Sequence, residues 1–250
     1  MLRFDSTREP LHSSLPPARM LRVTKPIKGR LVGASILCFC VDPLYGRVYF
    51  LLGKERHNSR WPSGSGKWSD FGGSTGEAET DAQSAAREFM EETLGIVKYF
   101  EHDTLPRTAW HDVAADLEAG NYTFRMSQGD KTRKFVTFVK QIPWDAEAPH
   151  RFSMYRATLT QPRRLEPPPG IDLTHHPALT HMSTTVKKEF LEKKVISMWS
   201  VPQLRRALEH GGVMTHRGGY VEQCRPRFLE RLEIILEQLA FILPDTLEEM

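Results

Sequence analysis

The chain has few cysteines and no long apolar run, and each absence narrows what the protein can be. Only three cysteines occur among 250 residues, at Cys38, Cys40 and Cys224. An odd number without the spacing of a disulfide framework is typical of reduced thiols, so the sequence predicts an intracellular protein in which Cys38 and Cys40 pack within a strand. No stretch approaches the roughly 20 apolar residues of a membrane span, which argues against a membrane partner. The apolar core of a secretory signal is also missing.

Acidic residues are scarce in the first 30 positions, where Asp5 and Glu9 stand against seven lysines and arginines. Serines and a proline pair interrupt any periodicity there. One interpretation is a basic N-terminal arm over residues 1–30 without fixed structure. The other is a transit peptide, because such peptides are rich in Arg and Ser and poor in acids. We therefore predict a cytoplasmic protein, with a mitochondrial location as the alternative.

The chain also lacks internal repeats and a strong excess of either charge. Its net charge is +3 and its pI about 8.7, a balance that permits a nucleotide or nucleic-acid partner without demanding one. With 250 residues and 40% hydrophobic content, it is long enough for one well-packed domain with extensions.

What the sequence does contain is a concentration of carboxylates within residues 72–96. Arg87, Glu88, Glu91 and Glu92 fall within one and a half turns of a predicted helix. At about 100° per residue, Glu88 and Glu92 lie about 40° apart, and Glu91 lies about 60° to the other side of Glu88. Carboxylates this close repel one another, so the arrangement calls for a cation. Ligand sets made only of oxygen favour Mg²⁺ or Mn²⁺ over zinc.

The residues around this cluster predict a loop followed by a helix. Gly72 and Gly73 give a loop whose backbone can approach a ligand closely. Thr80 and Gln83 have the spacing of a capping box, which predicts the start of a helix. Gly95 suits the position just after the end of that helix.

This pattern resembles the signature of the Nudix hydrolases, in which a glycine is followed at fixed spacing by glutamates and an Arg-Glu pair. The spacing is matched by Gly73, Glu79, Arg87, Glu88, Phe89, Glu91 and Glu92. The chain departs from the signature by one extra residue before Gly95. Because this residue follows the last carboxylate, we expect it to alter the exit of the helix and to leave the metal-binding face intact.

The resemblance implies the Nudix fold, an α/β arrangement in which a mixed β-sheet is sandwiched between helices. It places the Nudix domain over residues 31–210, with an insertion near 145–182. Residues 211–250 are then a C-terminal helical extension.

The resemblance also implies a metal-dependent pyrophosphohydrolase that cleaves the diphosphate linkage of a nucleoside diphosphate joined to a further group. We expect Mg²⁺ or Mn²⁺ to be held by Glu88, Glu91 and Glu92. The carbonyl of Gly72 or Gly73 is expected as a further ligand.

Other catalytic roles fall to side chains around this set. Arg87 lies four residues before Glu91, so it can orient that carboxylate through a charge-assisted hydrogen bond. The general base is either Glu88 or a glutamate outside the signature, with Glu189 and Glu192 as the candidates. Those two residues have a second interpretation, as solvated residues of a helix.

Lys54 and Arg56 lie at the end of the strand that precedes the signature. They either contact substrate phosphates or form a solvated strand end. Removal of a cap or a 5′ pyrophosphate from RNA is an alternative function, favoured by the basic segments and expected to show steep salt dependence of binding. A non-catalytic nucleotide- or RNA-binding protein is disfavoured, because all the metal-ligand glutamates are present.

Apolar and alternating runs predict the remaining elements. Strands are expected over residues 31–41, 47–53, 97–101, 121–126 and 134–142, with the first two and the last two paired as hairpins. Helices are expected over Val201–His210 and from about Pro226 onward, where apolar side chains recur at helical spacing.

Overall fold

The structure, a computed structural model, describes residues 29–58, 65–101, 109–160, 188–214 and 221–243. Nearly all of the predicted basic arm lies outside the described residues, as does the 161–182 part of the predicted insertion. Among the described residues, no helix combines the length and the apolar character needed to cross a membrane.

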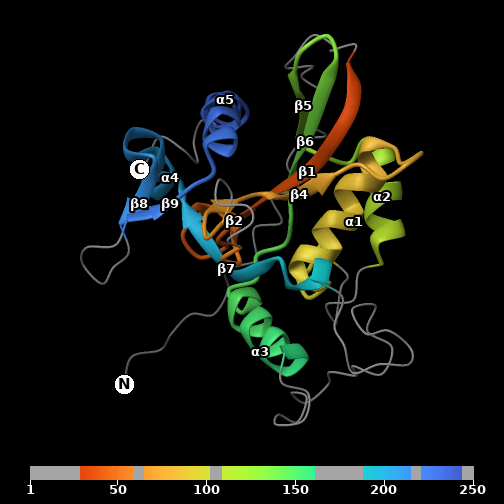
Figure 1. The fold of residues 1–250 in the computed structure, drawn as a ribbon. Helices are drawn as coiled ribbons and strands as arrows, with labels where there is room; N and C mark the ends of the chain where they lie inside the picture. The colour runs from red at the N-terminus through yellow and green to blue at the C-terminus, as the bar shows by residue number, and fades with distance from the viewer. Residues whose placement is uncertain (1–28, 59–64, 102–108, 161–187, 215–220, 244–250) are drawn as a thin grey trace, which may run out of the picture.

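A mixed seven-stranded sheet forms the centre of the molecule (Figure 1). Its strands are β1 (Arg30–Val41), β2 (Val48–Glu55), β3 (Trp68–Ser69), β4 (Phe71–Ser74), β5 (Phe124–Gly129), β6 (Arg133–Gln141) and β7 (Lys193–Ser200). β1 runs parallel to β6 along one edge. Its other edge is shared, because its first half pairs with β4 and its last residues pair with β2. Beyond Leu51, β2 leaves β1 and continues between β3 and β7.

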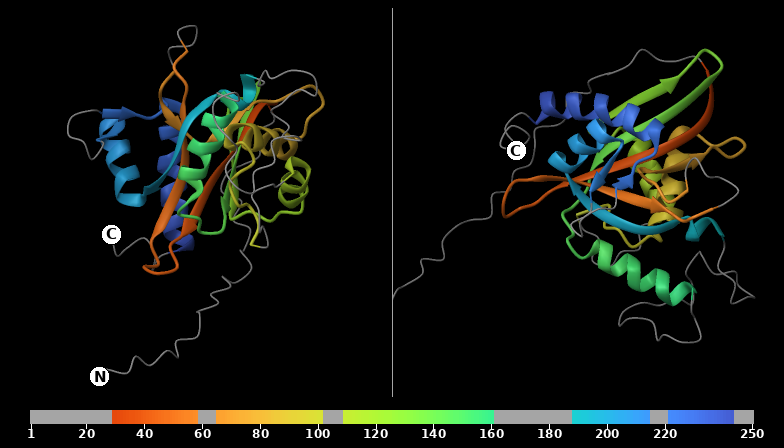
Figure 2. Two further views of the ribbon diagram at one scale, coloured as in Figure 1. Left: turned by 90° about the horizontal axis from the view of Figure 1, so that it is seen from below. Right: turned by 60° about the vertical axis from the view of Figure 1, so that its left-hand side comes forward.

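Helices cover both faces of this sheet (Figures 1 and 2). They are α1 (Asp81–Thr93), α2 (Trp110–Glu118) and α3 (Ala148–Thr160) on one face, and α4 (Val201–His210) and α5 (Pro226–Ile242) on the other. Side chains of β1 alternate between the two cores, with Ile36 and Cys38 toward α1 and Leu37 and Phe39 toward α5. The predicted α/β architecture, a mixed sheet between helices, is confirmed.

Both predicted hairpins are present, as β1 with β2 and β5 with β6. The prediction of a strand over residues 97–101 is wrong. Val97 and Tyr99 are buried in the core, but the segment is irregular and pairs with no strand of the sheet. Burial of alternate side chains therefore does not distinguish a strand from an irregular core segment in this region.

The prediction that residues 145–182 form one long loop is wrong for its first part, which contains α3. Phe152, Tyr155 and Leu159 recur at i, i+3 and i+7 and join the core on the α1 face. This helical spacing is short, and the run of prolines that follows it dominates the composition of the segment.

The C-terminal segment is helical only in part. A two-stranded ribbon of β8 (Gly212–Met214) and β9 (Val221–Gln223) precedes α5, which begins at the predicted Pro226. The buried side of α5, including Leu232 and Ile235, belongs to the same core as Leu37 and Phe50 of the central strands.

Candidate active site

Helix α1 presents its glutamates at the boundary between the core and a cavity. It starts with the predicted capping box, in which the Thr80 hydroxyl and the Gln83 side chain each accept from the other residue's amide at 3.1 Å. Phe89 anchors the inner side of the helix against the sheet. The same side carries Glu88 and Glu92, which are only 9% and 2% exposed.

Arg87 links the loop before α1 to the carboxylates of its last turns. Its Nε and Nη2 donate to Glu79 at 2.8 and 3.2 Å, and Nη2 also donates to the Ser74 carbonyl at 2.9 Å. Its Nη1 donates to Glu88 at 2.9 Å and to Glu91 at 3.1 Å. The expected Arg87–Glu91 pair is therefore present, within a wider set of charge-assisted bonds.

The prediction that Gly72 and Gly73 lie in a loop is wrong, because both belong to strand β4 and pair with β1, and there they lie directly against these carboxylates. The Gly72 amide donates to Glu92 Oε2 at 2.7 Å. A Cβ added to Gly73 would lie 2.6 Å from the Glu88 carboxyl group, so a side chain there would displace that carboxylate. The close approach inferred from the sequence is thus observed, whereas a metal-binding role for either carbonyl stays a prediction.

Two glutamates from other elements join Glu92. Glu55 is the last residue of β2, and Glu192 immediately precedes β7. One carboxylate oxygen from each of the three residues lies within 4.8 Å of the others. Glu55 and Glu92 are buried, while Glu192 is exposed. The structure therefore brings the sequence-predicted Glu192 to the signature helix and adds Glu55.

A buried lysine lies within this group. The Lys193 ammonium donates to Glu55 Oε1 at 2.6 Å and lies 3.2 Å from Glu92 Oε1. It also donates to the Ser69 hydroxyl at 3.0 Å. Burial by itself lowers the pKa of this amine, but Glu92 and Glu55 outweigh burial, and the pKa is raised. Lys193 is therefore a permanent positive charge between two carboxylates.

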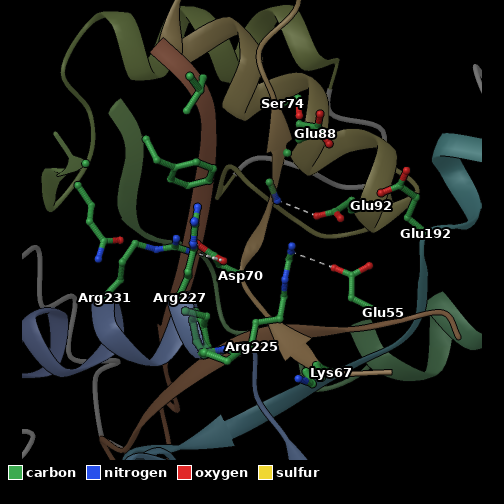
Figure 3. Close-up of a pocket in the computed structure, with 18 of the residues that line it drawn as sticks. Glu55, Lys67, Asp70, Ser74, Glu88, Glu92, Glu192, Arg225, Arg227 and Arg231 are labelled. Atoms are coloured by element: carbon green, nitrogen blue, oxygen red, sulfur yellow. Dashed lines mark hydrogen bonds and ion pairs between the residues drawn. The ribbon is translucent and has the colours of Figure 1, made fainter. Parts of the chain in front are cut away.

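The glutamates of the site line one side of a cavity of about 1400 Å³ (Figure 3). The acidic side consists of Glu55, Glu88, Glu91, Glu92 and Glu192. The side toward α5 carries Arg227 and Arg231, and Arg225 and Lys67 lie between that side and Glu55 (Figure 3). The cavity thus offers opposite charges to the two ends of an elongated ligand.

The acidic side fits a divalent cation bound through oxygen. Burial raises the pKa of Glu88 to about 7, although Arg87 offsets part of this effect. Burial also raises the pKa values of Glu91, Glu92 and Glu192. Carboxylates outnumber the neighbouring cations, and a divalent ion favours their ionised forms. Mg²⁺ and Mn²⁺ prefer this kind of donor set.

Two sequence-predicted residues are not brought to the cavity. Lys54 Nζ donates to Glu222 at 2.8 Å, and Arg56 is exposed after the end of β2. Because side chains alternate along a strand, Glu55 points into the cavity and Lys54 points away from it. Glu189, the other candidate base, lines the cavity.

Sequence reasoning missed Glu55, Asp70, Lys193 and the arginines of α5. The available signal was a charged residue next to an apolar, β-prone run, since charges at such positions are usually paired when buried. Their partners are not readable from the sequence, because Lys193 and Glu55 are 138 residues apart.

No family model and no curated protein matches this chain. Among solved structures it is similar to a Nudix hydrolase from M. smegmatis, RenU, at 14% identity over 86% of this chain and 89% of that chain, with a TM-score of 0.39. It is similar to the NUDIX domain of Shewanella oneidensis NrtR, solved with ADP ribose, at 11% identity over 85% and 90%, with a TM-score of 0.40. A C. elegans Ap4A hydrolase gives 12% identity over 84% and 97%, with a TM-score of 0.39. Identities this low do not carry over a substrate, so any functional assignment rests on the residues of the site.

Proposed function

We propose that this protein is a metal-dependent pyrophosphohydrolase that uses Mg²⁺ or Mn²⁺ to cleave the diphosphate linkage of a nucleoside diphosphate joined to a further group. The observation that carries the proposal is the convergence of Glu55 and Glu192 on Glu92, within 4.8 Å, although neither belongs to α1. A merely solvated acidic face would not bring the buried carboxylate of Glu55 from another element to Glu92, because burying charge is costly.

In this proposal Glu88, Glu91 and Glu92 hold the cation, with Glu55 beside them. When bound, the ion neutralises charge on the phosphoryl oxygens and aligns the diphosphate for attack by water. Arg87 keeps the Glu88 and Glu91 carboxylates in place through the bonds described above. The residues around the ion are therefore positioned before the substrate arrives.

Glu192 is the residue that we assign as general base. It is exposed beside Glu92, and no hydrogen bond or ion pair ties its carboxylate to another described residue. A carboxylate with this freedom can accept the proton of the attacking water. Glu88, the alternative base, is already held by Arg87 at 2.9 Å.

The test is hydrolysis of a substrate panel by the purified chain with Mg²⁺, Mn²⁺ or a chelator. The panel contains nucleoside diphosphate sugars, dinucleoside polyphosphates, nucleoside triphosphates and capped RNA, and the phosphate products are identified by mass spectrometry. Capped RNA is included because RNA 5′-end hydrolysis stays an alternative that the described residues do not test.

We expect Glu91→Gln and Glu92→Gln to lower kcat by about two orders of magnitude or more, with the fold retained. Glu192→Gln should lower kcat and leave metal affinity near that of the parent. Glu237→Gln, an exposed change on α5, is the matched control and should change neither. The proposal is wrong if Glu91→Gln and Glu92→Gln both cleave every substrate of the parent at the parental rate.

A further inference from the structure

The side of the cavity toward α5 carries positively charged side chains that have no role in the proposed hydrolysis. The cavity is lined by the cationic residues Lys67, Arg133, Arg225, Arg227 and Arg231, in addition to Arg87 of α1. Figure 3 shows Arg227 and Arg231 on the far side of the cavity from Glu88 and Glu192. Arg227 and Arg231 therefore face a part of the ligand that lies away from Glu88 and Glu192.

Arg231 connects α5 to Asp70, which also lines the cavity. Its Nη2 donates to both carboxylate oxygens of Asp70, at 2.8 and 2.9 Å. Its guanidinium lies 4.7 Å from the centre of the Phe135 ring. Asp70 also accepts from the Ser35 hydroxyl at 2.6 Å. Because Asp70 immediately precedes β4, this buried pair holds the start of α5 at a fixed place relative to the glycines of β4.

Two more cations, Arg225 and Lys67, lie between this side and Glu55, whose amide donates to the Lys67 carbonyl at 2.9 Å. The Arg225 amide donates to the Trp68 carbonyl at 2.9 Å, which places the neighbouring Lys67 beside the start of α5. Arg225 Nη1 lies 3.4 Å from Glu55, so part of its charge is neutralised. Lys67 has no ion-pair partner among the described residues.

Arg227 and Arg133 complete this side. Arg227 precedes Arg231 by four residues, so both side chains lie on the same face of α5. Arg133 precedes Phe135 by two residues in β6, so the two side chains extend from the same face of the strand. This is the face on which the Phe135 ring packs against Arg231. Both arginines are exposed, and neither has an ion-pair partner within the part of the chain that the structure describes.

The acidic residues on this side are already engaged in the β5–β6 hairpin and its contact with α5. The Asp130 carboxylate accepts from the amides of Thr132 and Arg133 at 2.7 and 2.9 Å. Glu230 accepts from the Gln128 side chain at 3.2 Å. Lys67, Arg133 and Arg227 therefore remain available to an anionic ligand.

We propose that Lys67, Arg133 and Arg227 form an anion-binding subsite for a phosphate group of the substrate other than the two in the hydrolysed linkage. Guanidinium and ammonium groups suit phosphate in geometry and charge. The subsite rests on the proposed function and narrows its substrate class to compounds with at least one additional phosphate, such as dinucleoside tetraphosphates.

The first test measures binding without catalysis. Inorganic tripolyphosphate is titrated into the full chain by calorimetry in the presence of a chelator at low ionic strength. We expect binding by the parent, and a Kd about tenfold higher in each of Arg227→Gln, Lys67→Gln and Arg133→Gln. Arg206→Gln, an exposed change on α4 outside the cavity, is the control and should bind like the parent.

The second test compares two substrates under saturating Mg²⁺ or Mn²⁺. For each variant we take the ratio of kcat/KM for a dinucleoside tetraphosphate to kcat/KM for a nucleoside diphosphate sugar. The subsite predicts that this ratio falls about tenfold in Arg227→Gln, mainly through KM for the tetraphosphate, and stays constant in Arg206→Gln.

Several outcomes would overturn the subsite, and they are distinct from failure of the proposed function. Absence of tripolyphosphate binding in the parent, or equal Kd values in parent and variants, refutes the subsite whether or not the protein is a hydrolase. Equal losses on both substrates also refute it, because the cations would then act on the hydrolysed diphosphate. If Arg227→Gln weakens the binding of a 5′-phosphorylated RNA decamer and leaves the binding of tripolyphosphate unchanged, the subsite is refuted and this side of the cavity binds RNA instead. Absence of hydrolysis of every substrate refutes the proposed function alone.

Discussion

At the scale of single residues, the buried ammonium of Lys193 offsets the repulsion between the carboxylates of Glu55 and Glu92. Among the described residues, Lys193 and Arg231 are the buried basic side chains, and the Lys193 ammonium contacts Glu55 and Glu92. The pKa of Lys193 is raised above its ordinary value of 10.5. Its stabilising contribution is therefore present at neutral pH and is lost only as the pH rises through the folded-state pKa.

Replacing Lys193 by Met should lower the free energy of unfolding by about 3–5 kcal/mol, because two buried carboxylates would lose their cation. Divalent cations should restore more stability to this variant than to the parent, because they can supply the missing charge. Chemical denaturation with and without Mg²⁺ measures both effects. Lys194→Met, at the exposed neighbour, is the control and should change stability by less than about 0.5 kcal/mol. Equal effects of the two substitutions would contradict the assigned role of Lys193.

The cysteines are packing residues, as the sequence predicted, since Cys38 and Cys40 are fully buried and all three thiols are free. Burial raises the pKa of Cys40 and of Cys224 from 9.0 to about 12, and it raises that of Cys38 as well. At pH 8 a thiol with a pKa of about 12 is ionised in about one molecule in ten thousand.

Thiol labelling should therefore be at least about a hundredfold slower in the folded protein at pH 8 than in urea, because the thiolate is the reactive form. In the folded state the rate should rise about tenfold for each pH unit below the thiol pKa. Stopped-flow labelling with a disulfide reagent measures the rates of the three cysteines. A thiol that reacts in the folded protein as fast as in urea would contradict this burial.

At the scale of elements, the loop and exit of α1 use left-handed backbone at residues other than glycine. Ala78, in the loop before the helix, has a φ of 64°, and Leu94, its C-cap, has a φ of 59°. Leu94 and Gly95 together turn the chain out of the helix after Thr93. The change of chain direction therefore lies in the exit of α1, after Glu92, as the sequence predicted.

Ala78→Gly should raise the free energy of unfolding by about 0.5–1 kcal/mol, because glycine adopts this φ without a steric penalty. Ala78 is exposed, so no packing is lost. The same substitution at Ala115, an exposed residue inside α2, should lower stability by about 1 kcal/mol. Urea unfolding of both variants gives the comparison, and effects of the same sign would contradict the role of the backbone conformation.

At the scale of the whole molecule, α5 completes both the second core and the cavity. Its inner side packs on the sheet face opposite α1, and its first turns carry the arginines that line the cavity. The division of the chain into a Nudix domain over 31–210 and an extension over 211–250 remains a proposal. The shared core predicts that the extension does not unfold separately.

Ile235→Ala should lower stability by about 2–5 kcal/mol, because this fully buried side chain lies between α5 and the sheet. Ile234, its neighbour, is 37% exposed, and Ile234→Ala should cost less than about 1 kcal/mol. Thermal unfolding monitored by intrinsic tryptophan fluorescence should keep a single transition in both variants. A separate early transition in Ile235→Ala would show that α5 folds as an independent unit.

The sequence by itself determined the features that depend on neighbours along the chain. The capping box at Thr80, the carboxylate face of α1 and the start of α5 at Pro226 were readable because helices are set by residues within a few turns. The two hairpins were readable because each joins adjacent strands. The irregular segment 97–101 was not, since its burial comes from packing against distant elements.

Only the tertiary structure decided which charges meet. Glu55 reaches Glu92 because β2 leaves β1 after Leu51 and ends beside the last turns of α1. Arg231 reaches Asp70 across 161 residues because α5 lies on the opposite face of the sheet from α1. Ion pairs of this kind carry no local periodicity, so their partners are fixed by the arrangement of the strands and helices and not by spacing in the sequence.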